Sequence, residues 1–372
     1  MRRLLLMLLA VATLTQLAAA APASALPPVR HVFVIVLENK GVEDTFGPTG
    51  WLNAPYLSRQ LTSQGELLTR YYGIGHNSAD NYLAMVSGQP PTPASKDDCP
   101  DPLFSVGGPP VGPYGLAPGD GCLYPANYLT IADQLVAGGF TWRGYNEGIP
   151  APCSMDHSSG NYARKHNPWV FFDSLRASGQ CQANDVGLDQ LPADLRSPQT
   201  TPNLVYVVPD QCEDGHTACP STFPIGNPIT DDQDGLRQAD AFLKVWVPRI
   251  LGSPAFKKDG LLIITFDEAV ESTACCNEQP GPADPNPGGY VQGMPGPGGG
   301  DTGAVLLSKF VKPGSLNVNE YNHYSLLRSL EDLFGLSHLG YAAQAGLQPF
   351  GSDVFNASGQ PAASKRPRAR RF

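Results

Sequence analysis

The sequence of 372 residues has a formal net charge of -9 at pH 7. Recognition of nucleic acid needs a basic face that neutralises phosphates, so this charge argues against nucleic acid as a partner. No polar linker divides the chain, and its length suits one large α/β domain better than two equal domains.

The N-terminal segment has the pattern of a secretory signal peptide. A basic start at residues 1–3 is followed by the apolar run 4–20 and by small residues that end at Ala25. This order predicts a signal peptide over 1–25, with cleavage near Ala25, and a secreted or extracytoplasmic protein. The alternative is an uncleaved membrane anchor, although no basic stop-transfer flank follows the apolar run.

Residues 31–37 form a continuous apolar and β-branched run, typical of a strand that is buried on both faces of a sheet. Glu38 and Asn39 follow it directly. Open α/β sheets bind their ligands at the carboxyl ends of strands, which favours a site here; a surface turn is the alternative. Residues 55–64 then predict an amphipathic helix that carries a proline in its first turn.

The stretch 75–88 turns at Gly75, presents His76 and Ser78, and runs into an apolar helix closed by glycine. Unpaired N–H groups and the helix dipole favour a phosphate at a helix start, so we interpret Ser78 as a nucleophile. The alternative is that Ser78 serves only as a helix N-cap. Asn81, one helical turn later, is a candidate donor to a phosphate oxygen.

The middle of the chain predicts a helix over 128–137 and a strand over 140–145. A basic group follows at Arg164, Lys165 and His166 in an otherwise acidic chain. These side chains offer charge-assisted donors to a phosphate, and the histidine a proton for a leaving alkoxide; a solvated face is the alternative.

Two further strands of the buried type are predicted over 204–208 and 261–266. The first leads into a turn with Asp214 and His216, and the second ends at Asp267 and Glu268. Three independent strand ends therefore carry acidic or imidazole side chains.

A helix over 234–250 with a bend at Pro248, a short strand over 304–307 and a helix over 323–334 complete the regular elements. Strands that alternate with helices predict an α/β fold with a mostly parallel sheet covered on both faces. We expect a single domain over 26–355.

Two proline- and glycine-rich insertions interrupt this domain near 89–125 and 273–300, and segments of this kind need disulfides or a function to order them. The chain has 8 cysteines, an even number without the C-x-x-C pairs of a zinc ribbon, so disulfides are expected. We expect Cys275 and Cys276 to bond two different partners rather than each other. The basic tail 356–372 is either a solvated, disordered end or a peripheral contact with an anionic surface.

The strand ends together form a set of hard oxygen ligands, with a mixed carboxylate and imidazole set beside it. Oxygen donors suit Mg²⁺, Ca²⁺ or Mn²⁺, whereas imidazole favours Zn²⁺ or Fe. A divalent cation beside Ser78 would lower the pKa of its hydroxyl and neutralise the phosphate oxygens. The alternative for His323, which precedes an apolar run, is that it caps a helix or packs in the core. The candidate ligands are Glu38, Asn39, Asp267 and Glu268, with Asp214, His216 and His323 in the mixed set.

These motifs, in this order, resemble the bacterial phosphoesterase family of secreted acid phosphatases and phospholipase C enzymes, within the alkaline phosphatase-like superfamily. The nearest likeness is to small secreted acid phosphatases that act on phosphatidylinositol 3-phosphate. The matching pieces span nearly all of the mature chain. They are Val34 to Asn39, His76-x-Ser78-x-x-Asn81-Tyr82, Tyr162 to Trp169, Asp214-x-His216, Thr265-x-Asp267-Glu268 and His323-Tyr324.

The resemblance implies a three-layer α/β/α sandwich and a divalent metal ion held by Glu38, Asn39, Asp267 and Glu268. It implies that Ser78 becomes phosphorylated. Asp214 would orient a histidine or help to hold a second ion. The residues implied around the phosphate, as binders or acids, are His76, His166, His216 and His323.

The resemblance also bears on cross-links and substrates. It suggests a disulfide between Cys99 and Cys153. Phospholipase C members carry His-Gly-Gly after the acidic pair, whereas Ala269 and Val270 follow here, which favours a monoesterase. The leading hypothesis is a secreted, metal-dependent phosphomonoesterase that acts on a small-molecule or lipid phosphate ester, phosphoinositides included. The alternatives are a phospholipase C-type phosphodiesterase and a non-catalytic secreted binding protein on the same fold.

Overall fold

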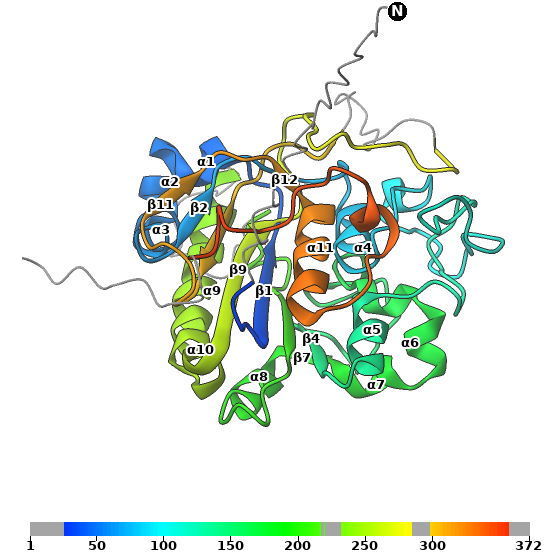
Figure 1. Ribbon diagram of the computed structural model, residues 1–372, viewed down its shortest axis with the longest axis horizontal. Helices are drawn as coiled ribbons and strands as arrows, with labels where there is room; N and C mark the ends of the chain where they lie inside the picture. Colours follow the sequence, from blue (N-terminus) through cyan, green and yellow to red (C-terminus); the bar gives the residue numbers. More distant parts are fainter. Residues whose placement is uncertain (1–25, 217–218, 220–231, 285–297, 357–372) are drawn as a thin grey trace, which may run out of the picture.

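The computed structural model describes residues 26–216, 219, 232–284 and 298–356 (Figure 1). The predicted signal peptide, part of the second insertion and the tail from residue 357 onward lie outside the described residues. None of the helices in the described part of the chain combines the length and apolarity needed to cross a bilayer.

The strands are β1 His31–Leu37, β2 Glu66–Leu68, β3 Tyr71–Tyr72, β4 Trp142–Asn146, β5 Ser158–Ser159, β6 Tyr162–Ala163, β7 Asp185–Gly187, β8 Leu204–Val208, β9 Gly260–Phe266, β10 Ala304–Leu307, β11 Ser315–Asn317 and β12 Tyr321–Asn322. The helices are α1 Val42–Phe46, α2 Pro48–Asn53, α3 Thr62–Gln64, α4 Ser78–Ser87, α5 Ile131–Ala137, α6 Asp173–Ala177, α7 Gln180–Asn184, α8 Leu191–Asp194, α9 Asp232–Gly252, α10 Pro254–Asp259 and α11 His323–Phe334. Short turns include the π-helical η1 Tyr56–Leu61 and the 3-10 turns η2 Ser95–Asp97 and η3 Arg164–His166.

The central feature is an 8-stranded sheet in the order β11-β2-β10-β9-β1-β8-β4-β7. Strand β1 pairs in parallel with both β8 and β9, while β10 runs antiparallel to β9 and β2. The predicted α/β class with a mostly parallel sheet is therefore confirmed.

Helices cover both faces of the sheet, and Figure 1 shows α4 and α11 on one side of β1 and α9 and α10 on the other. All seven residues of β1 are buried, and alternate side chains serve opposite layers. Val32, Val34 and Val36 pack in one core cluster, and Phe33 and Ile35 in the other. Each such side chain contributes about 1.5–3 kcal/mol by leaving water, so the run fixes β1 in the middle of three layers.

Most predicted elements have the expected boundaries, and the exceptions have local causes. The helix predicted from residue 128 begins only at Ile131, because Thr130 and Asp133 form a reciprocal capping box. The helix predicted over 55–64 is a π-helical turn followed by α3. Its first N–H groups at Tyr56 and Leu57 donate to the carboxylate of Asp240, at 3.3 and 2.8 Å.

The disulfides correct two sequence expectations. Cys99 bonds Cys122 and Cys153 bonds Cys181, so the suggested Cys99–Cys153 bond is wrong. Cys99 and Cys122 both lie in the first insertion and close that segment on itself. The adjacent cysteines at 275 and 276 bond each other, contrary to expectation, and the fourth bond joins Cys212 and Cys219.

Candidate active site

Strand register brings together the polar residues that follow two neighbouring strands, Glu38 with Asn39 and Asp267 with Glu268. Leu37 of β1 lies beside Phe266 of β9, so the residues that follow each strand emerge at the same edge of the sheet. The Asp267 carboxylate accepts hydrogen bonds from the backbone N–H groups of Asn39 (3.1 Å) and Glu268 (2.7 Å). Glu38 and Asp267 are fully buried.

The amide of Asn39 lies at the centre of this group. One terminal atom of the amide is 3.2 Å from Glu38 Oε2, 3.2 Å from Asp267 Oδ1 and 3.3 Å from Glu268 Oε1. The other terminal atom is 3.1 Å from His216 Nε2. The amide has two possible orientations. If its oxygen faces the three carboxylates, four oxygen atoms converge as they do around a hard divalent cation. If its nitrogen faces them, the amide donates hydrogen bonds to the carboxylates. The donor set therefore fits a divalent metal ion.

Ser78 is the first residue of α4, and its N-cap is Asn77, which makes no side-chain capping bond. Ser78 Oγ instead donates to Glu38 Oε2 at 2.8 Å. The chain reaches this position through a tight approach at Gly75, where a Cβ atom would lie 2.2 Å from Asp80 Oδ2. Helix α4 ends at Gly88 in the left-handed conformation.

Glu38 also connects Ser78 to a buried histidine. Tyr82, one turn along α4, donates its hydroxyl to Glu38 Oε1 at 2.7 Å and stacks on the ring of His166. His166 Nε2 lies 3.3 Å from Glu38 Oε2, and its Nδ1 lies 3.9 Å from Asp214 Oδ2. Ligand atoms of Glu38, His166 and Asp214 all lie within 4.8 Å of one another, so they form a second group that fits a metal ion.

Burial governs the ionisation of this site. It raises the pKa of Glu38 and Glu268, and the charge of Asp267 raises both further. It raises the pKa of Asp267 to about 6 and that of Asp214 to about 8. Burial, together with the charge of Lys165, lowers the pKa of His166 well below its ordinary value. Carboxylates held together out of water in this way bind a cation in exchange for protons.

A cavity of ≈ 360 Å³ opens beside Ser78. Lys165 extends into it and pairs with Asp98, with Nζ 2.9 Å from Oδ2. Burial opposes the charge of Lys165, but Asp98 and Glu38 outweigh burial and raise its pKa above the ordinary value. The lining residues are Asn39, His76, Asn77, Ser78, Asp98, Lys165, His216, Glu268, Ala269 and Val270.

Three predicted site residues lie behind the cavity wall and bind the backbone. Asn81 accepts from the N–H groups of Ile74 (2.6 Å) and Gly75 (3.2 Å), so it holds the loop before Ser78. Arg164 donates to the carbonyl oxygens of Met155 (3.0 Å) and Cys99 (2.9 Å). Asn81 and Arg164 therefore hold the backbone of neighbouring loops in position.

His323 is the third of these residues and is fully buried. Its Nε2 lies 2.5 Å from the carbonyl oxygen of Asp267, and its Nδ1 lies 3.0 Å from the hydroxyl of Tyr71. Burial lowers its pKa to about 4. A neutral His323 therefore supports the backbone that carries the acidic pair.

Tyr82 and Asp98 belong to the site but were not selected from the sequence. Tyr82 lies four residues after Ser78, so helical spacing places the two on one face, but a tyrosine in an apolar helix is typical of a core residue. Asp98 lies in an insertion without periodicity, and no sequence signal points to it.

Comparison with known proteins shows the family to which the chain belongs. A model of the Phosphoesterase family matches residues 50–337. The chain is 28% identical over 327 residues to a phosphatidylinositol-3-phosphatase of Mycobacterium tuberculosis, covering 87% of this chain and 83% of that protein. It is 24% identical to a probable acid phosphatase of Kluyveromyces lactis, covering 84% of this chain but 59% of the yeast protein.

The fold is also similar to solved structures. A protein in the alkaline phosphatase superfamily from Vibrio parahaemolyticus aligns with a TM-score of 0.52 at 15% identity. The alignment covers 85% of this chain and 68% of that one. This likeness concerns the fold, which is of the alkaline phosphatase type.

Proposed function

The chain belongs to the Phosphoesterase family and is a hydrolase of phosphoric ester bonds, and from this premise we propose that it is a secreted, metal-dependent phosphomonoesterase of the acid phosphatase type with Ser78 as nucleophile. One observation carries the proposal. The Ser78 hydroxyl lies at the start of α4, faces the cavity and donates to Glu38 Oε2 at 2.8 Å. Its neighbours are the oxygen donors at the ends of β1 and β9.

Glu38, Asn39, Asp267 and Glu268 would hold the divalent cation, and their converging oxygen atoms support this assignment. Asp214 would hold a second ion together with Glu38 and His166. A bound cation would withdraw charge from the phosphate and favour ionisation of the serine hydroxyl.

The reaction begins when Ser78 Oγ attacks phosphorus, so that an O–P bond forms as the ester P–O bond breaks. The Ser78 proton passes to Glu38 Oε2, which already accepts its hydrogen bond. His216, exposed at the cavity, protonates the leaving alkoxide. Water then attacks phosphoserine with the neutral His216 as base. As the bond between Ser78 Oγ and phosphorus breaks, Glu38 returns its proton to Oγ, so phosphate is released and the hydroxyl is restored.

Binding of the phosphoryl group falls to Lys165, His76 and the first N–H groups of α4, which surround the Ser78 end of the cavity. Asn81, Arg164 and His323 act as positioning residues through their backbone contacts. The site thus combines a nucleophile, an acid and a phosphate cradle.

The substrate is a small-molecule or lipid phosphate ester. The similar mycobacterial protein is a phosphatidylinositol-3-phosphatase, which makes phosphoinositides the first lipids to assay. Secretion is supported by four disulfides that engage all 8 cysteines.

Replacement of the nucleophile tests the proposal. Ser78→Ala should lower kcat for an aryl phosphate monoester by roughly a thousandfold or more, because the covalent step is lost. The lost hydrogen bond to Glu38 should lower the melting temperature by only about 2–4 °C. Ser63→Ala, at an exposed serine on α3, is the matched control and should keep full activity. Near wild-type turnover by Ser78→Ala would exclude the serine mechanism. Turnover of a bis-aryl phosphate or phosphatidylcholine at a comparable rate would instead favour the phosphodiesterase.

A further inference from the structure

Asp98, in the first proline- and glycine-rich insertion, forms part of the cavity wall beside Ser78. Its Oδ1 accepts a hydrogen bond from the backbone N–H of Ala79 at 3.2 Å, and its Oδ2 lies 2.9 Å from Lys165 Nζ. A first-turn amide and an ammonium group are the features that a protein offers to an anion. A carboxylate of the protein itself therefore engages both.

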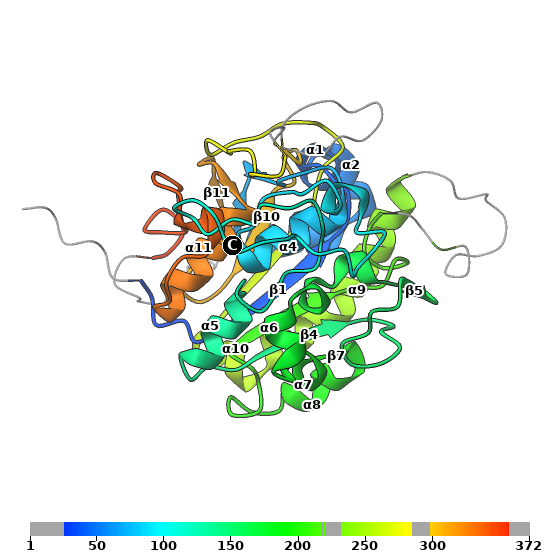
Figure 2. The ribbon, with the colours of Figure 1, turned by 90° about the vertical axis from the view of Figure 1, so that its right-hand side faces the viewer.

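The backbone holds Asp98 at this place. Asp98 and Cys99 both adopt the left-handed region, with φ of 53° and 55°, which non-glycine residues occupy only when the surrounding structure holds them. Cys99 is buried, bonds Cys122 and donates its N–H to the carbonyl of Ala94 at 2.9 Å. Figure 2 shows the blue-green coils of this insertion beside α4. The carboxylate is thus a fixed part of the wall.

Positive charge in the cavity is scarce. Lys165 is the sole lysine or arginine among the described residues that line it, and Asp98 already balances its charge. The internal segments outside the description, 217–218, 220–231 and 285–297, contain no lysine or arginine in the sequence. None of these three segments supplies a further lysine or arginine.

Negative charge, in contrast, surrounds the phosphate position. Asp98 and Glu268 line the cavity, and Glu38, Asp214 and Asp267 lie buried beneath it. The two divalent cations proposed above would offset four of these five charges, and Lys165 balances the fifth. Among the described residues that line the cavity, no lysine or arginine charge then remains to bind a second phosphoryl group on the substrate.

We propose that Asp98 is a specificity-determining residue that restricts this cavity to esters with one phosphoryl group, by repelling a second phosphate next to the scissile one. The same carboxylate holds Lys165 toward the first phosphate. This inference rests on the proposed phosphatase function and defines its substrate class as monophosphates whose neighbouring groups are uncharged.

The test compares two soluble inositol phosphates, one with a single phosphate and one with phosphates on neighbouring carbons. Wild-type kcat/KM should favour the monophosphate by about tenfold or more, given a repulsion between charges roughly 6 Å apart. Asp98→Asn keeps the size and the acceptor for Ala79 N–H but removes the charge, so it should reduce this ratio at least threefold. Asp97→Asn, the adjacent exposed carboxylate outside the cavity lining, should leave the ratio unchanged.

Salt provides a second measurement that needs no variant. Raised ionic strength screens the repulsion, so the wild-type preference should narrow as salt increases. Equal wild-type turnover of both substrates, or an Asp98→Asn variant that slows both by the same factor, would overturn the inference while the phosphatase function stands. No turnover of any monophosphate ester would reject the proposed function itself.

Discussion

At the scale of single residues, both carboxylate oxygens of Glu38 accept a hydrogen bond. Oε2 accepts from Ser78 at 2.8 Å, and Oε1 accepts from Tyr82 at 2.7 Å. Because the residue is fully buried, these two donors decide which oxygen faces the nucleophile. Tyr82 therefore acts through Glu38, as a positioning residue.

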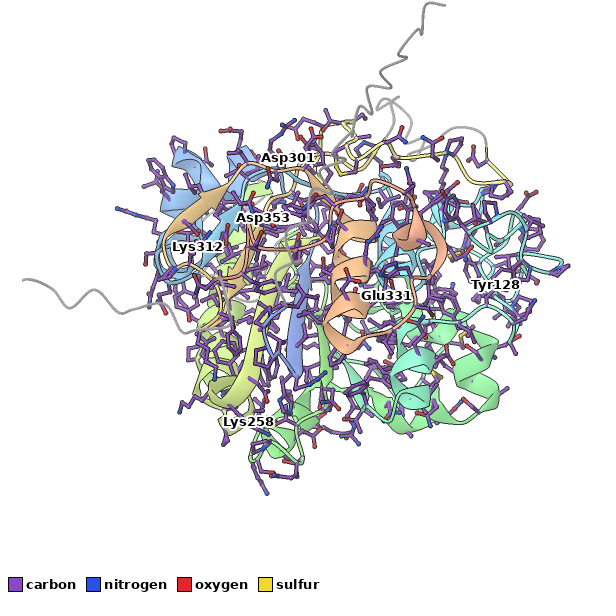
Figure 3. All side chains as sticks on the ribbon, viewed as in Figure 1. Tyr128, Lys258, Asp301, Lys312, Glu331 and Asp353 are labelled. Atoms are coloured by element: carbon purple, nitrogen blue, oxygen red, sulfur yellow. A yellow bond between two sulfur atoms is a disulfide. The ribbon has the colours of Figure 1, made fainter. Side chains whose placement is uncertain are left out.

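Tyr82→Phe should lower kcat about tenfold with little change in KM, because Ser78 loses a correctly oriented acceptor while phosphate contacts remain. The free energy of unfolding should fall by about 1 kcal/mol for the lost hydrogen bond. Tyr128→Phe is the matched control, since Tyr128 donates to the carbonyl of Gly108 in the first insertion (Figure 3). It should lose similar stability and keep kcat. Equal kcat values for the two variants would contradict the role of Tyr82.

The closeness of Glu38 and Asn39 to Asp267 and Glu268 could be predicted from the sequence for a physical reason. Polar residues directly after buried parallel strands share one edge of the sheet, and the register of β1 and β9 places Asn39 and Asp267 in contact. The inward direction of Asn81 and His323 was not predictable, because helical spacing does not tell whether a polar side chain faces a cavity or binds the neighbouring backbone. That distinction depends on the packing of the loop before α4.

At the scale of elements, α11 was predictable in full. Its N-cap Asn322 accepts from the Ser325 N–H at 3.0 Å, and Gly335 ends it in the left-handed conformation. Local signals of this kind act within a few residues. The short strands β2, β7 and β11, with three residues each, lack such signals and form only through pairing with the larger sheet.

Glu331 on α11 carries a pH dependence that is separate from the active site (Figure 3). It is fully buried, and one oxygen accepts from the Leu339 N–H at 2.9 Å. Burial raises the pKa of its carboxyl group from 4.5 to about 9. Between these values the folded state retains a proton that the unfolded state has released, so stability falls as pH rises.

Glu331→Gln should remove this dependence. From about pH 5 to about pH 9 the wild type should lose roughly 2–5 kcal/mol more of its unfolding free energy than the variant. Urea unfolding at a series of pH values measures the difference. Glu320→Gln, at an exposed carboxylate paired with Arg70, should follow the wild-type slope. Parallel slopes for wild type and Glu331→Gln would show that Glu331 ionises normally.

At the scale of the whole molecule, the layered core was predictable from the sequence, whereas the paths of the insertions and their disulfides were not. The layered core follows from hydrophobic periodicity, which the sequence displays directly. The cross-links depend on the paths of proline- and glycine-rich coils without periodicity, so neither spacing nor resemblance predicted that Cys99 bonds Cys122. For the same reason the place of Asp98 in the cavity wall, next to this disulfide, could not be predicted from the sequence.

Removal of this disulfide should affect both stability and specificity. The double variant Cys99→Ser/Cys122→Ser should lose about 3 kcal/mol of unfolding free energy, as expected for a loop of this size. It should also weaken the preference for monophosphates, because Asp98 is no longer fixed. Cys153→Ser/Cys181→Ser is the matched control, with a sequence separation of 28 against 23. This control variant should lose a comparable unfolding free energy without a change in its preference for monophosphates. An equal loss of that preference in both double variants would refute a specific role for the Cys99–Cys122 disulfide.

The most direct test of the central claim is acid quenching of the enzyme during turnover of a monoester, followed by mass spectrometry of the peptide that contains Ser78. The mechanism predicts one added phosphoryl group on Ser78 in the enzyme loaded with a divalent cation. Enzyme dialysed against a chelator should show none until the cation is restored. A phosphoryl group on another residue, or rapid turnover with Ser78 unmodified at every quench time, would contradict the account.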